Sequence, residues 1–223
     1  MQFIDNFKLF ESTFTQDPRI RSERLLTQAQ IEYPKIESLL EDNEFTNVPT
    51  IVFTDIVGSS EMWSSDPVEM MKQLKSHHEL VNRVSKENNG WIVKTIGDAF
   101  MLYFEPGPES LISALKCAKE IITQEQTYSL RIGACEGKVN EQFYEIQKVK
   151  LKDFYGTPVN AASRLESKIA EKGCIAFSST SKRLGQKFSA FIDKKVAQTD
   201  EVDLSKYNLK GVTLQSAFLT KIK

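Results

Sequence analysis

The chain has 223 residues, of which 40% are apolar and 26% charged, and its formal net charge is −1. This length fits one domain with a modest extension, and the composition is that of an ordinary globular protein. The near-zero charge excludes a global basic field that would draw the chain to nucleic acid or to an anionic membrane. Any phosphate must therefore be bound by local groups, and we expect no nucleic-acid partner.

Targeting and redox signals are weak in this sequence. No apolar run approaches the roughly 18 to 20 residues needed to cross a bilayer, and the start lacks the pattern of a signal peptide. Cys117, Cys135 and Cys174 are widely spaced and form no CxxC pair. We therefore expect three buried thiols in a reducing compartment, no membrane insertion and a cytoplasmic location.

The chain divides into an N-terminal arm and one compact domain. Residues 1–47 carry a helical stretch, roughly 22–41, which has an imperfect apolar face and is interrupted by Pro34. We read these residues as a helical arm rather than a second domain. The compact domain is expected over residues 48–223.

Predicted elements of the domain alternate between strands and helices. A buried strand at 50–53 ends at Thr54-Asp55, and Asp66-Pro67 is a helix start. The further predicted elements are a helix to about 88, strands 91–96 and 99–104, a helix 109–123, a strand 128–135, a helix 158–171, a strand 174–177, a short helix from about Ser179, and strands near 207–209 and 214–220. The order strand–helix–strand–strand–helix–strand predicts a mixed α/β (α+β) domain with a ferredoxin-like split βαβ sheet.

Two aspartates are the first candidates for chemistry. Asp55 ends the first strand ahead of small residues, and Asp98 lies in the two-residue turn of the predicted hairpin. Alone, each is as well explained as a cap or a turn residue. In a split βαβ sheet, however, the first strand lies beside the hairpin, so the two carboxylates can converge as in two-metal phosphoryl-transfer sites.

A third segment, YGTPVNAASR from Tyr155, contains Asn160 and Arg164. These two residues are four apart and share one helical face. An amide and a guanidinium placed together suit the charge that builds on a transferring phosphoryl group. A surface arginine beside a capping asparagine is the alternative reading of this segment alone.

Together these segments resemble the class III nucleotidyl cyclases, the adenylyl and guanylyl cyclase family. The stretches that carry the resemblance are FTDIVGSS from Phe53, VKTIGDAFM from Val93, LRIG from Leu130, YGTPVNAASRLES from Tyr155 and LKG from Leu209. The likeness is greatest to microbial and protist members. It implies that the chain closes a nucleoside triphosphate into a 3′,5′-cyclic nucleotide and releases pyrophosphate, as signalling cyclases do.

The resemblance also implies a role for each matching residue. Two Mg²⁺ or Mn²⁺ ions would be held by Asp55 and Asp98, assisted by the Ile56 carbonyl. Asn160 would position the ribose, and Arg164 would stabilise the transition state. The residues implied to bind the triphosphate are Gly58, Ser59 and Ser60, through their backbone N–H groups, and Arg131 and Lys210, through their side chains.

In this family the active sites lie between two catalytic domains. This chain carries both halves of the residue set once, so the resemblance implies a head-to-tail homodimer with two equivalent shared sites. Lys94 and Thr157 fall at the positions that the resemblance assigns to base recognition. An ammonium group can donate to adenine N1 and a hydroxyl can accept from the adenine amino group, so this pair favours ATP.

Two alternatives remain open from the sequence. One is a cyclase for another base, either a guanylyl cyclase or a pyrimidine cyclase that makes cyclic UMP or cyclic CMP in antiphage defence. The other is a regulatory module that binds a nucleotide without catalysis. A turnover assay with all four triphosphates distinguishes these readings, because each predicts a different product or none.

Overall fold

The structure, a computed structural model, describes residues 47–222 except 108, 126, 147 and 180–196. The expected N-terminal arm, apart from its last residue, lies outside the described residues. So does nearly all of the short helix expected from Ser179. The described part contains a seven-stranded sheet of order β2-β3-β1-β4-β7-β9-β8 and a separate two-stranded hairpin.

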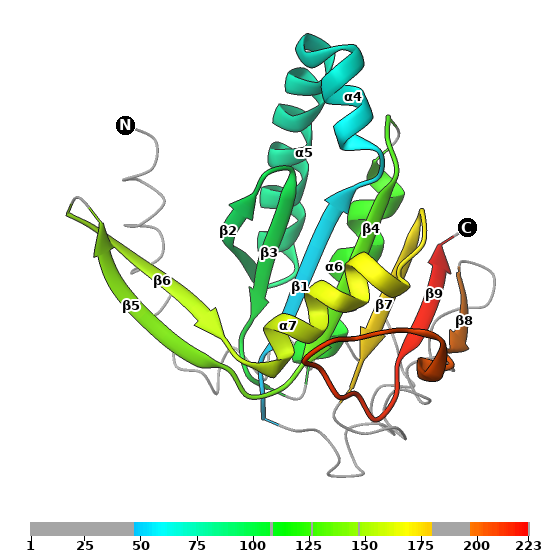
Figure 1. The fold of residues 1–223 in the computed structure, drawn as a ribbon. Helices are drawn as coiled ribbons and strands as arrows, with labels where there is room; N and C mark the ends of the chain where they lie inside the picture. The colour runs from blue at the N-terminus through cyan, green and yellow to red at the C-terminus, as the bar shows by residue number, and fades with distance from the viewer. Residues whose placement is uncertain (1–46, 108, 126, 147, 180–196, 223) are drawn as a thin grey trace. The chain divides into compact units, whose positions relative to one another are not determined.

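The first half of the sheet has the predicted split βαβ connectivity (Figure 1). Its elements in chain order are β1 (Thr50–Ile56), α4 (Ser59–Ser65), α5 (Pro67–Glu87), β2 (Gly90–Ile96), β3 (Ala99–Phe104), α6 (Ser110–Gln124) and β4 (Leu130–Glu136). β1 is antiparallel to both of its neighbours, β3 and β4. The ferredoxin-like expectation is therefore confirmed, and β1 is a central strand of the sheet.

The second half of the sheet departs from the expected elements near the end of the chain. β7 (Cys174–Ser178) runs parallel to β4, and β9 (Phe218–Ile222) and β8 (Ala197–Glu201) follow antiparallel. The predicted strand at 207–209 is wrong. The short 3-10 turn η2 (Leu204–Lys206) precedes it, and the Asp203 carboxylate accepts a hydrogen bond from the Ser205 amide at 3.2 Å. Local turns use backbone groups that strand pairing would need, since the Tyr207 amide donates to the Leu204 carbonyl at 3.1 Å and the Leu209 carbonyl accepts from the Val212 amide at 3.0 Å.

Helices cover both faces of the sheet, α5 and α6 on one and α7 (Thr157–Arg164) on the other (Figure 1). Side chains of a strand alternate between the faces. In β1, Val52 and Ile56 pack in the layer with α5 and α6, whereas Ile51 and Phe53 pack in the layer with α7. Asp55 continues the second set and therefore lies on the α7 side of the sheet.

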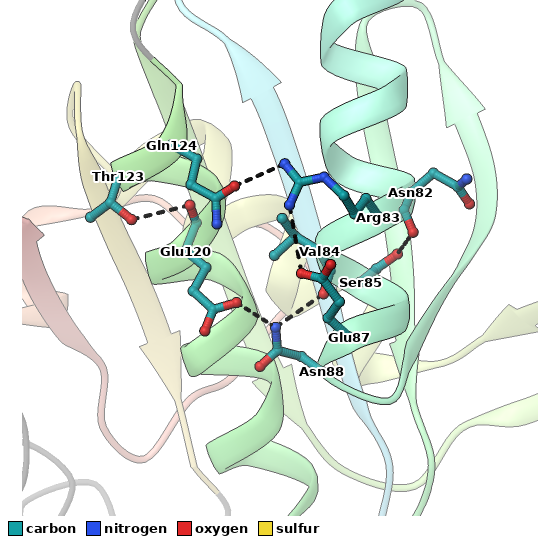
Figure 2. Close-up of polar contacts among 9 residues, drawn as sticks. All are labelled: Asn82, Arg83, Val84, Ser85, Glu87, Asn88, Glu120, Thr123 and Gln124. Carbon is teal, nitrogen blue, oxygen red and sulfur yellow. Dashed lines mark hydrogen bonds and ion pairs between the residues drawn. The ribbon is translucent and has the colours of Figure 1, made fainter. Parts of the chain in front are cut away.

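Polar contacts join α5 to α6 at the edge of their apolar layer (Figure 2). The Arg83 guanidinium donates to Gln124 Oε1 at 2.9 Å, and the Asn88 amide nitrogen donates to Glu120 Oε2 at 2.7 Å. At the other end of α5, Asp66 accepts from the Glu69 amide at 2.9 Å, which confirms the predicted helix start. The two helices are thus held as one layer behind the strands that carry the candidate site.

His77 of α5 is fully buried between the sheet and this helical layer. Its ring makes edge contacts with Phe100 and Tyr128, with ring centroids 5.1 and 5.5 Å away. Burial lowers the pKa of His77 from 6.5 to about 4; the charge of nearby Glu125 opposes the shift, and that of His78 adds to it. The imidazole is therefore neutral in the folded protein at neutral pH.

The buried histidine should make the fold acid-sensitive. The unfolded chain binds a proton at His77 near pH 6.5 and the folded chain only near pH 4, so stability is lost as pH falls through this window. The lost free energy of unfolding should be about 3 kcal/mol. Urea denaturation at pH 7 and at pH 4.5 should show that the free energy of unfolding falls less between these two pH values in His77→Leu than in wild type. Equal losses in both proteins would contradict this assignment.

A hairpin of β5 (Asn140–Ile146) and β6 (Val149–Tyr155) extends away from the main sheet (Figure 1) and was not predicted. One of its faces is anchored, because the Lys152 ammonium lies over the rings of Trp91 and Phe154 at 5.4 and 5.1 Å. The opposite face pairs Tyr144 with Leu151 and Ile146 with Val149. These four side chains are 36% to 57% exposed. The hairpin therefore presents a partly exposed apolar face.

Candidate active site

Asp55 and Arg131 form the centre of the site. The antiparallel register of β1 and β4 places these two residues opposite each other, and the Arg131 guanidinium donates a hydrogen bond to the Asp55 carboxylate. Asp98 lies in the turn between β2 and β3, next to Gly97 with φ 64°. Its Oδ2 accepts from the Ile56 amide at 3.2 Å. The structure therefore brings Asp98 to the residue that follows Asp55.

Glu166 also belongs to this cluster, although the sequence analysis assigned it no role. Its Oε1 lies 3.1 Å from Arg131 Nε, an ion pair without hydrogen-bond alignment. Burial, and then the charge of Asp55, raise the pKa of Glu166 to about 7, while Arg131 opposes the shift. Arg131 is thus held between two carboxylates, Asp55 on the neighbouring strand and Glu166 in the segment that follows α7.

A wide helical turn brings Glu166 to the sheet. The α-helix predicted over 158–171 ends at Arg164 and continues as the π-helical turn η1 (Leu165–Ile169), in which the Ala170 amide donates to the Leu165 carbonyl at 2.8 Å. This segment packs directly on Gly133 of β4. A Cβ atom at Gly133 would lie 2.2 Å from the Ala162 carbonyl oxygen and 2.3 Å from the Glu166 nitrogen. The glycine therefore permits the close approach.

The donor atoms fit a hard divalent cation. Asp55 and Asp98 offer carboxylate oxygens. Ile56, whose carbonyl is a further candidate ligand, follows Asp55 in the chain and donates its amide to Asp98. Among the described residues, no group of three or more His, Cys, Asp or Glu side chains is arranged to hold a metal. Mg²⁺ is commonly bound through one or two protein carboxylates together with substrate phosphates. Two aspartates are therefore enough protein ligands for a metal ion whose remaining ligands are phosphate oxygens of a nucleotide.

The chain after β1 turns into α4 at Gly58. Gly58 has φ 78°, in the left-handed region, and it precedes α4 without any side-chain cap. The first-turn amides of Ser59 and Ser60 consequently have no acceptor within the helix. The predicted phosphate-binding segment thus has N–H groups available beside the aspartate cluster.

Lys94 forms an ion pair with a residue that the sequence analysis did not select. Its Nζ donates to Asp153 Oδ2 at 2.5 Å, and the Asp153 side chain is 5% exposed. Burial opposes ionisation of Asp153, but hydrogen bonds from Lys94 and from the Phe154 amide outweigh it and hold the pKa of this carboxyl below its usual value. Thr157, the predicted partner in base recognition, is the exposed first residue of α7. Sequence reasoning therefore missed Asp153.

Arg164 and Lys210 come together in a second part of the site. They line one cleft, with Lys168, Lys206, Tyr207 and Asn208, whose volume is about 380 Å³. Asn160 lies one turn before Arg164 and is exposed on the same helix. Neither Asp55 nor Asp98 lines this cleft. The residues of the candidate site thus form three groups: the aspartate cluster with Arg131, the Lys94–Asp153 pair and the cationic cleft.

A sequence model of the adenylate and guanylate cyclase catalytic domain matches residues 40–219, which include all three groups of residues. The chain belongs to this family. Curated relatives include adenylate cyclases from Schizosaccharomyces pombe, 28% identical over 66% of this chain, and Neurospora crassa, 30% identical over 68%. The matched regions are 10% and 8% of those proteins, so the chain spans a small part of these cyclases.

Solved structures of cyclase domains share the fold. A guanylate cyclase domain from Catenaria anguillulae in complex with GTP gives a TM-score of 0.63, with 23% identity, and covers 80% of this chain and 98% of that one. The adenylyl cyclase CyaB from P. aeruginosa also gives 0.63, at 18% identity, covering 79% and 93%. Both base specificities occur among these neighbours, so the cyclase fold alone does not select the base. None of the helices in the described residues is long and apolar enough to span a membrane.

Proposed function

We propose that this cyclase domain converts ATP into 3′,5′-cyclic AMP and pyrophosphate. The observation that carries the proposal is the convergence of Asp98 on the residue after Asp55, beside Arg131. Two carboxylates with a neighbouring guanidinium suit two divalent cations, Mg²⁺ or Mn²⁺, and the triphosphate that they accompany. Buried thiols at Cys117, Cys135 and Cys174 favour a reducing, cytoplasmic setting for the reaction.

The reaction is an in-line attack of the ribose 3′-oxygen on the α-phosphorus, with pyrophosphate as the leaving group. Bound metal ions supply a lower pKa for the attacking hydroxyl and neutralise the triphosphate. In the reaction, the Arg131 guanidinium exchanges its hydrogen bond to Asp55 for one to a phosphate oxygen. Its Nε atom remains paired with Glu166. Asn160 orients the ribose. Arg164 and Lys210 meet the negative charge of the transferring group, together with the amides of Gly58, Ser59 and Ser60.

The base is recognised by Lys94 and Asp153. The ammonium group donates and the buried carboxylate accepts, which matches the acceptor N1 and the donor amino group of adenine. The adenylate cyclases among the relatives support the same base. In this proposal Asp153 replaces Thr157, since Asp153 is the residue that contacts Lys94.

This assignment predicts a change of base selectivity. Asp153→Asn replaces a carboxylate, which only accepts hydrogen bonds, with an amide that both donates and accepts. The ratio of kcat/KM for ATP to that for GTP should therefore fall by roughly tenfold or more. Thr157→Ala is the matched control and should leave the ratio within about twofold, because a solvated side chain contributes little. Steady-state turnover of both nucleotides measures the ratio. A shift in Thr157→Ala without one in Asp153→Asn would restore the threonine assignment.

The two halves of the site are best completed by a second copy of the chain. The cationic cleft with Arg164 and Lys210 does not contain the aspartate cluster, so one chain offers each half at a different place. The partly exposed apolar face of the β5–β6 hairpin is of the kind found at protein interfaces, and an isolated hairpin is marginal in water. The proposal is therefore a head-to-tail homodimer with two shared sites.

Turnover of all four triphosphates tests the proposal. With Mg²⁺ or Mn²⁺, ATP should give cyclic AMP and pyrophosphate at a higher kcat/KM than GTP, CTP or UTP. Cyclic GMP, cyclic UMP or cyclic CMP as the main product would overturn the choice of base. Triphosphate binding without pyrophosphate release, even with Mn²⁺, would instead identify a regulatory module.

A further inference from the structure

The cationic cleft contains more positive charge than the proposed reaction has used. Of its four cations, Arg164 and Lys210 already have roles, whereas Lys168 and Lys206 have none. Lys168 belongs to the π-helical turn η1, four residues after Arg164. The same turn therefore points Glu166 toward the sheet and keeps Lys168 in the cleft with Arg164.

These cations are poorly neutralised by the described part of the protein. Lys206 Nζ lies 3.5 Å from Asp203 Oδ2, and both side chains are more than half exposed, so this pair is weak. Within the described residues, no ion pair involves Arg164, Lys168 or Lys210. The four positive groups line one space of about 380 Å³, so an anion in that space would have several cations as partners.

We propose that Lys168 and Lys206 are further contacts for the terminal phosphates of the substrate and for the released pyrophosphate. The inference rests on the proposed function, which places the triphosphate at Arg164 and Lys210. A polyphosphate carries several negative charges at a spacing that separate ammonium groups can meet, and a cleft of this volume lies in the range of ligand sites. Phosphate oxygens would then replace Asp203 as the partner of Lys206.

Binding and kinetics of the full chain test the inference together. Lys168→Gln and Lys206→Gln should each weaken binding of inorganic tripolyphosphate, measured by calorimetry, by about three- to tenfold. The KM for ATP and the inhibition constant of pyrophosphate should rise by similar factors, with kcat within about twofold of wild type. Lys172→Gln is the matched control, because this exposed lysine lies four residues after Lys168 and does not line the cleft.

The outcomes separate this inference from the proposed function. Unchanged tripolyphosphate affinity in both variants, or an equal loss in Lys172→Gln, would overturn the role of the two lysines. If the wild-type chain is an active cyclase and Lys168→Gln and Lys206→Gln leave its KM and pyrophosphate inhibition unchanged, the role of the two lysines is also overturned. The cyclase assignment then stands. A chain that forms no cyclic nucleotide but loses tripolyphosphate binding in these variants would support the cleft and contradict the cyclase.

Discussion

Asp55→Asn and Asp98→Asn should each lower cyclic AMP formation by roughly a thousandfold or more. Each change keeps the shape of the side chain but removes one of the two negative charges that lie at the end of β1, where the metal ions are proposed to bind. Loss of metal-bound catalysis removes several kilocalories per mole of transition-state stabilisation, and each tenfold in rate corresponds to about 1.4 kcal/mol. Steady-state turnover with saturating Mg²⁺ and Mn²⁺ measures the effect.

Glu87→Gln is the matched control for these variants. Glu87 is an exposed carboxylate at the end of α5 that pairs with Arg83 at 3.6 Å (Figure 2), far in sequence from β1. Its neutralisation should leave turnover within about twofold of wild type. Thermal denaturation should show that all three variants are folded. Turnover above about a tenth of wild type in a folded Asp55→Asn or Asp98→Asn protein would contradict their role as metal ligands.

Gly133→Ala should have the largest effect on the fold. The added Cβ would collide with backbone atoms of Ala162 and Glu166 rather than with a flexible side chain, so α7 and η1 must move off β4. Overpacking of this kind should lower the free energy of unfolding by about 3 kcal/mol or more. Turnover should fall as well, because the same movement displaces Glu166 from Arg131 and shifts Arg164. Urea denaturation and turnover measure the two effects.

Gly107→Ala provides the comparison for this change. A Cβ atom at Gly107 meets no atom within 4 Å, so the same substitution there should alter stability by no more than about 0.5 kcal/mol. A Gly133→Ala protein with wild-type stability would show that the close packing of η1 on β4 is not required. Wild-type turnover in a destabilised Gly133→Ala protein would separate that packing from the geometry of the site.

The parts of the site that the sequence predicted share a physical basis. Asp55 and Asp98 were found because connectivity decides which strands are neighbours, and connectivity follows from the order of helical and strand patterns. Asn160 and Arg164 share a face because the α-helical period holds up to Arg164. In each case, a local sequence pattern together with the correct topology determines the relative position of two side chains.

The parts that were missed depend on contacts between distant segments. Asp153 is an isolated acid between Lys152 and Phe154, and only the unpredicted hairpin brings it to Lys94, 59 residues earlier. The hairpin itself alternates lysines with apolar residues, a pattern equally typical of a solvated edge. Likewise, the π-helical turn that carries Glu166 packs against Gly133 of β4, a contact that the α-helical pattern of the local sequence does not reveal.

A mixture of Asp55→Asn and Arg164→Ala proteins tests most directly the claim that this domain forms cyclic AMP at a site shared by two chains. Each variant alone should be nearly inactive. In a mixed dimer, one site receives Asp55 from one chain and Arg164 from the other and is intact, so an equal mixture should recover up to about a quarter of wild-type cyclic AMP formation. A mixture no more active than the sum of its two components would contradict the shared site.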